Sequence, residues 1–156
     1  MSKAVLISIR PKWCDLIARG KKTIEVRKTR PKLETPFKCY IYQTLPKSGD
    51  WNDRDGRVIG EFVCDRIEST NCFSGWVCPE KNNIIKRFLD GSCLSEQEIV
   101  DYADGRAVCG WHISDLMIYD MPKNLGEFEV RKDYGRWITW EKVSRPPQSW
   151  CYVEEM

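Results

Sequence analysis

The N-terminal segment changes its hydrophobic pattern twice within a short span, and this change constrains the fold more than any other feature. Residues 4–9 form an apolar run with β-branched side chains, which is typical of a buried strand. Pro11 suits the first turn of a helix, and Gly20 suits the residue that follows its end. Residues 23–27 then alternate between polar and apolar side chains. The segment therefore predicts a strand, a short helix over residues 11–19 and a second strand.

Strand-like segments recur along the rest of the chain, at residues 37–44, 57–68, 107–118 and 149–153. Gly60, inside the second of these segments, is a candidate for a β-bulge. Ser95 and Glu98 form a capping box, which predicts a helix that runs to about Ala103. Residues 83–89 predict one or two further helical turns. Short strands with a few helices between them favour an α+β fold built on a curled sheet or small barrel.

Length and composition indicate a single globular domain over residues 1–156. Hydrophobic residues make up 42% of the chain, which is enough for a core, and the mean hydropathy is −0.51. No apolar run approaches the roughly 18 residues of a membrane helix. The N-terminal apolar run is too short for a signal peptide. We therefore expect a cytoplasmic protein without a membrane partner.

The charge is distributed unevenly, although the net charge is only +2. Residues 1–50 hold 12 Lys and Arg against 4 Asp and Glu, and residues 51–156 hold 13 against 19. A basic first third suggests a face for an anionic partner. The alternative is that these charges are simply solvated wherever they fall.

The eight cysteines do not have the spacing of a metal site or of a secreted disulfide framework. Their closest pair, Cys72 and Cys78, has five residues between them, whereas zinc sites usually contain Cys-x₂-Cys. Without a signal peptide, we expect all eight cysteines to be reduced. His112 is the only histidine and is expected to be a packed, hydrogen-bonded residue. No P-loop, dinucleotide fingerprint or nucleophile elbow is present, so we expect no metal and no cofactor.

Residues 20–27 form the most specific cluster of charged residues in the chain. On a strand, Glu25 and Arg27 share one face, and Ile24 and Val26 point into the core. Lys22 precedes the strand and can reach the charged face. Two cations and a carboxylate next to a helix end resemble a site for a polar or anionic ligand. The alternative is an amphipathic strand with a surface salt bridge.

The pattern Gly20-x-Lys22-x-x-Glu25-x-Arg27 resembles the G-x-K-x-x-E-x-R signature of the ASCH domain. The resemblance is clearest over residues 4–28, and the strands at 57–68 and 149–153 are compatible with it. It implies a PUA-like fold, which is a small β-barrel with peripheral helices and a cleft beside the barrel. Relatives in that superfamily bind RNA or read modified nucleobases. Residues 70–105 are then an insertion that the signature does not explain.

The resemblance implies that the signature residues line a basic cleft that binds RNA, a nucleotide or a modified base. Cations of the N-terminal third would face phosphates, Glu25 would accept a hydrogen bond from an exocyclic amine, and an aromatic ring would stack on the base. Trp51 lies in a polar loop and is a candidate lid. The candidate ligand-binding residues are Arg10, Lys12, Lys22, Glu25, Arg27, Tyr42, Trp111, Ser149 and Trp150. Replacing Lys22 and Arg27 with Ala is expected to abolish binding without disturbing the fold.

Besides binding, two classes of function stay open, and the first is an enzyme on nucleic acid or a nucleoside. One subclass of the family hydrolyses the amide of N4-acetylcytidine with a Lys, a Thr and a Glu; Lys22 matches the Lys, but Glu25 stands where that Thr would be. Another member is a ribonuclease that uses Tyr, Lys and Ser, for which Tyr42, Lys22 and Ser149 are candidates. If the protein is an enzyme, Lys22 and Glu25 are the expected catalytic residues. The second class is a protein-interaction module of phage type. A fixed charge network favours binding over hydrolysis.

Overall fold

The computed structural model describes residues 2–75 and 81–156. Its elements divide between two compact units. The first unit comprises Met1–Asp15, Phe37–Val63 and Asp115–Met156, and the second comprises Leu16–Pro36 and Cys64–Ser114. The second unit thus contains the whole of the predicted insertion at 70–105, and the expectation of a single domain stays a prediction. None of the helices in the described ranges has the length and apolar character needed to span a membrane.

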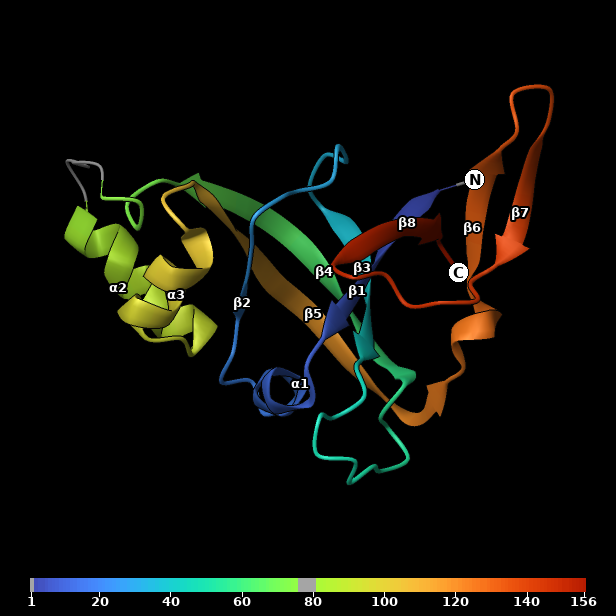
Figure 1. The fold of residues 1–156 in the computed structure, drawn as a ribbon, viewed down its shortest axis with the longest axis horizontal. Coiled ribbons are helices and arrows are strands. Elements are labelled where there is room, and N and C mark those ends of the chain that lie inside the picture. Colours follow the sequence, from blue (N-terminus) through green and yellow to red (C-terminus); the bar gives the residue numbers. More distant parts are fainter. Residues whose placement is uncertain (1, 76–80) are drawn as a thin grey trace. The chain divides into compact units, whose positions relative to one another are not determined.

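The first unit is built around β1 (Lys3–Ile9), which is almost completely buried. It pairs in parallel with β3 (Phe37–Gln43) and antiparallel with β8 (Trp150–Glu154), as Figure 1 shows. These three strands confirm the predicted ones to within about a residue at each end. Their inward side chains form a core with the residues that pack on them: Ala4, Leu6, Tyr40, Tyr42, Val58, Phe128, Val143 and Val153. Burial of such side chains is the main stabilising contribution to this unit.

The strands β4 (Arg57–Thr70) and β5 (Val108–Lys123) are longer than the sequence predicts. The six-stranded mixed sheet has the order β2-β5-β4-β3-β1-β8, which ends at β2 and β8. The described strands do not close into a barrel, so the predicted barrel is not confirmed. Gly60 lies within β4, where a Cβ atom would approach Met117 O of β5 to 2.5 Å. Glycine is therefore required there by the close approach of two backbones.

A two-stranded sheet of β6 (Glu129–Asp133) and β7 (Ile138–Lys142) follows a short 3₁₀ helix, η1 (Leu125–Glu127). The sequence did not predict this hairpin. Most of its side chains are exposed, so it lacks the clear alternation by which half-buried strands are recognised. At its tip, Gly135 has a φ of +78°, and its N–H donates to Asp133 Oδ1 at 2.9 Å. This glycine is the one local signal of the turn.

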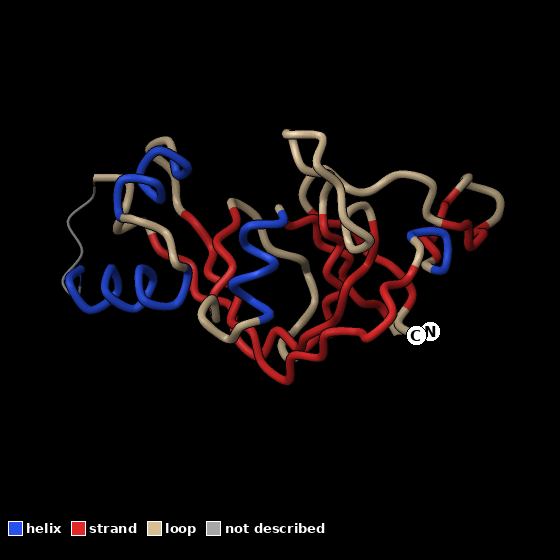
Figure 2. The backbone as a smooth tube through the Cα atoms, turned by 90° about the horizontal axis from the view of Figure 1, so that it is seen from below, coloured by secondary structure: helices blue, strands red, loops and turns tan. Residues whose placement is uncertain are grey.

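The second unit contains β2 (Ile24–Arg27), α2 (Lys81–Ser92) and α3 (Glu96–Ala103), and α1 (Pro11–Ala18) leads into it. The two helices α2 and α3 follow one another and lie together (Figures 1 and 2). Their apolar faces pack on β2 and β5 in a second core, made of Ile24, Val26, Phe73, Phe88, Ile99, Ala103 and Val108. The predicted insertion therefore supplies the helical cover of β2.

The helix α3 begins at the predicted capping box. Ser95 Oγ accepts the N–H of Glu98 at 3.1 Å, and Glu98 Oε1 accepts the N–H of Ser95 at 3.2 Å. The helix ends at Asp104, which adopts a left-handed conformation with a φ of 49°. Both ends therefore agree with the prediction, whereas α2 extends beyond the one or two turns predicted over residues 83–89.

Candidate functional site

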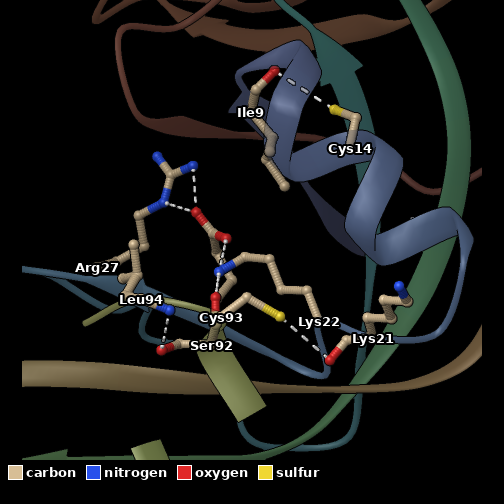
Figure 3. Close-up of polar contacts among 9 residues, drawn as sticks. Ile9, Cys14, Lys21, Lys22, Arg27, Ser92, Cys93 and Leu94 are labelled. Atoms are coloured by element: carbon tan, nitrogen blue, oxygen red, sulfur yellow. Dashed lines mark hydrogen bonds and ion pairs between the residues drawn. The ribbon is translucent and has the colours of Figure 1, made fainter. Parts of the chain in front are cut away.

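The end of α1 determines where Lys22 lies. Gly20 has a φ of +74°, and the N–H groups of Lys21 and Lys22 both donate to Leu16 O, at 3.0 and 3.1 Å. This turn directs Lys22 inward, where it is only 2% exposed. Its ammonium group donates to Ser92 O at 2.7 Å, as Figure 3 shows. The lysine is thus held between the start of β2 and the end of α2.

The carboxylate of Glu25 lies between the two cations of the signature. Arg27 Nε and Nη2 both lie 2.9 Å from Glu25 Oε1, and Lys22 Nζ lies 3.4 Å from Glu25 Oε2. The three side chains form one cluster, the signature cluster, in which Arg27 binds one carboxylate oxygen and Lys22 lies next to the other. Ile24 and Val26 point into the core of the second unit, as the alternation of the strand requires.

The signature cluster carries one positive charge in excess, since two cations surround one carboxylate. Glu25 is 6% exposed, and its Oε2 accepts no hydrogen bond from any described residue despite the ion pair with Lys22. Buried carboxylate oxygens normally accept hydrogen bonds, because an unsatisfied one costs about 1–3 kcal/mol or more. Glu25 Oε2 is therefore a buried, unsatisfied acceptor next to positive charge.

Ser92 contacts the signature cluster and was not predicted from the sequence. Its backbone carbonyl, and not its side chain, accepts the bond from Lys22. Its hydroxyl accepts the N–H of Leu94 at 3.2 Å, and the left-handed Cys93, with a φ of 60°, turns the chain between α2 and α3. A backbone carbonyl leaves no residue signature, and Ser92 lies in the segment that the signature does not explain. No sequence pattern could have identified it.

Tyr102 of α3 is a second residue that the sequence did not single out. Lys28 Nζ lies 4.9 Å from the centre of its ring, and the side chain is 37% exposed. Partial burial raises the pKa of its hydroxyl. The charge of Arg27 and a hydrogen bond with the backbone of Lys28 act in the opposite direction and limit this rise in pKa. Tyr102 is thus a half-exposed aromatic ring beside two cations of the basic segment.

Trp111 is not available for stacking, which corrects the sequence prediction. Its ring is fully buried, and its indole N–H donates to Thr29 O at 3.3 Å. The polar neighbour His112 points to the opposite face, because adjacent residues on a strand alternate. Trp111 stands opposite Glu25 in the pairing of β2 with β5. Because directly opposed residues of two paired strands share one face, Trp111 packs beside Glu25.

The other five predicted ligand-binding residues belong to the first unit. Arg10 and Lys12 are exposed, and Lys12 Nζ lies 4.6 Å from the centre of the Trp13 ring. Tyr42 is part of the first unit's core, and burial raises the pKa of its hydroxyl. Ser149 O accepts the N–H of Ser8 at 2.9 Å, and Trp150 packs edge-on against Tyr152. Their grouping with the signature cluster stays a prediction.

His112 is packed against charged residues, as expected of the lone histidine. Arg66 Nη2 lies 3.3 Å from both ring nitrogens, and Glu68 Oε1 lies 3.5 Å from Nε2. Burial, and then the charge of Arg66, lower the pKa of the imidazole. No group of three or more His, Cys, Asp or Glu side chains in the described ranges has the arrangement of a metal site.

The described cysteines are free thiols: Cys14, Cys39, Cys64, Cys72, Cys93, Cys109 and Cys151. Cys78 lies outside the described residues. Burial raises the pKa of Cys64 to about 12 and that of Cys151 to about 11, so neither thiol is a reactive nucleophile. Trp51, the candidate lid residue, is 63% exposed.

Comparison with known proteins identifies the family. The ASCH domain model matches residues 7–143, which include the whole signature cluster and both helices of the second unit. The chain belongs to the ASCH family. No curated protein matches the chain. The G-x-K-x-x-E-x-R resemblance was therefore a correct indication of the family.

Solved structures of an ASCH protein from Zymomonas mobilis share the fold of this ASCH chain. One is 24% identical, with a TM-score of 0.67, and covers 97% of this chain and 88% of its own. A tyrosine-to-phenylalanine variant is 23% identical, with a TM-score of 0.68, and the match covers 99% of this chain and 92% of that chain. A serine-to-alanine variant is 24% identical, with a TM-score of 0.68, and the match covers 97% of this chain and 89% of that chain. At this identity the likeness establishes the fold alone.

Proposed function

We propose that this ASCH protein binds RNA, a nucleotide or a modified base through the signature cluster. ASCH domains are generally thought to bind RNA, which agrees with the proposal. The observation that carries it is Glu25 Oε2, a buried acceptor without a hydrogen bond from a described residue, held next to Lys22 and Arg27. Such an acceptor matches the exocyclic amine of a nucleobase, since an amine donates the hydrogen bond that Glu25 Oε2 lacks.

The cations around the cluster suit the remaining parts of a nucleotide. Arg27 is 11% exposed and can extend toward a phosphate while it stays paired with Glu25. Lys28 lies on the surface beside the half-exposed ring of Tyr102. Stacking of a base on an aromatic ring is worth about 1–3 kcal/mol. In this proposal Tyr102, rather than the buried Trp111, supplies the aromatic ring that stacks on the base.

Binding is favoured over amide hydrolysis by the composition of the cluster. Hydrolysis needs a nucleophile or a water-activating group beside the lysine. Here Glu25 is already bound by Arg27 through two contacts of 2.9 Å, and Lys22 is anchored to Ser92 O. These contacts orient both groups in a fixed network and leave no hydroxyl at the position of the hydrolytic Thr. The proposal includes a cytoplasmic location, which the free thiols of the described residues support.

The test compares binding and turnover in the same preparations. Fluorescence anisotropy with a labelled single-stranded RNA is expected to show saturable binding that weakens steeply between about 50 and 200 mM salt, because phosphate contacts release counterions. Glu25→Gln and Arg27→Gln should each weaken binding by about tenfold. Lys47→Gln, a charge change at an exposed lysine of the other unit, is the matched control and should have a much smaller effect.

The same proteins are then incubated with N4-acetylcytidine, and the release of cytidine is followed. We expect no efficient turnover. Rapid turnover that disappears in Glu25→Gln would establish the hydrolase instead. Absence of RNA binding at low salt, in folded protein, would refute the proposed function.

A further inference from the structure

A hollow of about 830 Å³ lies in the second unit and is distinct from the signature cluster. It is bounded by the start of β2, one face of α2 and one residue of β5. The residues that line it are Lys21, Thr23, Ile24, Asn83, Lys86, Arg87, Asp90, Gly91 and His112. None of the three signature side chains is among them. Its volume falls within the range of pockets that hold small molecules, roughly 300–1,000 Å³.

One stretch of backbone separates the hollow from the cluster. Thr23 N–H donates to Gly91 O at 2.7 Å, next to the contact of Lys22 with Ser92 O. Lys22 thus belongs to the cluster and Ser92 contacts it, whereas their neighbours Lys21 and Gly91 line the hollow. Figure 3 shows that the side chains of Lys21 and Lys22 diverge. A ligand in the hollow would therefore contact a different set of side chains from a ligand at Glu25.

The hollow is lined by three cations and one carboxylate. The ammonium groups of Lys21 and Lys86 form no ion pair with any residue in the described ranges. Asp90 is the only carboxylate among the lining residues. Two ammonium groups around one concave surface, neither of them paired with a carboxylate of a described residue, create a positive potential that attracts an anion.

Arg87 is held in place at the edge of the hollow. Its Nε donates to Glu68 Oε1 at 3.0 Å, and its Nη2 contacts the other oxygen of the same carboxylate. Glu68 also lies 3.5 Å from His112 Nε2, so the guanidinium and the imidazole share one anchor. These contacts with Arg87 lower the pKa of Glu68, which therefore stays ionised. A guanidinium fixed in this way loses less conformational entropy when it binds a ligand.

We propose that this hollow is a second binding site, which takes the phosphate group of a nucleotide or of an RNA backbone. Lys21 and Lys86 supply the charge, and the fixed guanidinium of Arg87 supplies directed donors. The hydroxyl of Thr23 and the amide of Asn83 add uncharged hydrogen-bond partners along the same wall. The ring of His112 provides a surface for the organic part of a nucleotide.

The first experiment detects the site with inorganic phosphate as the probe. In a ¹H–¹⁵N NMR titration of the full chain, the backbone amides of Lys21, Thr23, Lys86 and His112 should shift saturably. The double variant Lys21→Gln/Lys86→Gln should weaken phosphate binding by about tenfold. Lys47→Gln/Lys132→Gln removes the same charge from two exposed lysines outside the hollow and should change it by less than about twofold. Equal effects of both double variants, or shifts elsewhere only, would overturn the proposal.

Two further titrations distinguish the sources of the phosphate. If the ligand is a free nucleotide, 5′-CMP should shift the hollow's signals at lower concentration than inorganic phosphate does. If the ligand is instead an RNA backbone, an oligoribonucleotide without terminal phosphates should shift the hollow's signals at lower concentration than inorganic phosphate does. The hollow is also separable from the proposed function, because Arg27→Gln should weaken RNA binding at the cluster and leave the response of the hollow to phosphate unchanged. Loss of that response in Arg27→Gln would contradict two separate sites.

Discussion

Lys22 has a structural role as well as a proposed role in binding. Its side chain is 2% exposed and joins the start of β2 to the end of α2 through Ser92 O. Removing one partner of a buried ion pair leaves the other charge without compensation, which typically costs 3–5 kcal/mol. We therefore predict that Lys22→Ala lowers the free energy of unfolding by about 3 kcal/mol or more in urea denaturation.

This prediction replaces the expectation, drawn from the sequence, that replacing Lys22 and Arg27 with Ala leaves the fold intact. Arg27→Ala is the comparison, because Arg27 is more exposed and its loss leaves Glu25 paired with Lys22. It should cost clearly less than Lys22→Ala. Equal stability of wild type and Lys22→Ala would show that the ammonium group is not held in the buried position.

The lone histidine predicts how stability depends on pH. The pKa of His112 is lowered in the folded state, from an ordinary value of 6.5. Below that value the unfolded chain takes up a proton that the folded state resists, so the free energy of unfolding should fall as the pH decreases from about 7.5 to about 5.5. His112→Asn should flatten this dependence. Glu68, whose pKa is also lowered, acts in a more acidic range, below its ordinary value of 4.5. An unchanged pH dependence in the variant would exclude His112 as its source.

At the scale of secondary structure elements, the contact between α2 and β2 depends on a glycine. A Cβ atom on Gly91 would lie 2.5 Å from Ile24 Cδ1 and 3.3 Å from Ile24 Cβ. Ile24 is itself buried in the core of the second unit, so it has little room to move. Gly91→Ala should therefore destabilise the protein by about 1–3 kcal/mol through overpacking.

The matched control for this prediction is Gly126→Ala. No atom lies within 4 Å of a Cβ built on Gly126. Its replacement should change stability by no more than about 0.5 kcal/mol, as for most surface positions. Thermal or urea unfolding of both variants provides the measurement, and a Gly91→Ala protein as stable as wild type would mean that the two elements are not in close contact.

The elements that could be predicted from the sequence are those with strong local signals. The capping box of Ser95 and Glu98 located the start of α3, and the β-branched apolar run located β1. The hairpin of β6 and β7 lacked such a signal, because none of its strand residues is fully buried. The signature cluster was predictable in part: alternation placed Glu25 and Arg27 on one face, but neither Ser92 O nor Tyr102 could be connected with them before the fold was known.

At the scale of the whole molecule, a count of free thiols tests whether the cysteines of the protein are reduced. Seven of them are free thiols in the structure, and the eighth, Cys78, is expected to be free as well. Thiol titration under denaturing, non-reducing conditions should therefore count about eight groups per chain. Under native conditions far fewer should react, since most of the described cysteines are buried and the pKa of Cys64 is raised to about 12. A denatured count near zero would mean that disulfides form.

The division of the chain explains why the whole site could not be predicted. The signature residues Lys22, Glu25 and Arg27 all belong to the second unit, whereas Arg10, Lys12, Tyr42, Ser149 and Trp150 belong to the first. Spacing along the chain identifies residues that share one strand, but it carries no information on which distant segments meet. The family resemblance identified the signature correctly, and the helices that cover it come from the segment that the signature leaves unexplained.

The most direct test of the central claim observes the cluster itself while RNA binds. The Arg27 Nε–H group donates to Glu25 Oε1 at 2.9 Å and should give a protected signal in a ¹H–¹⁵N spectrum. During titration with a short single-stranded RNA at low salt, we predict a saturable shift of this signal, with matching shifts of the Lys22 and Glu25 amides. Binding that leaves these signals unchanged, or no binding at all, would contradict the proposal that the signature cluster is the recognition site.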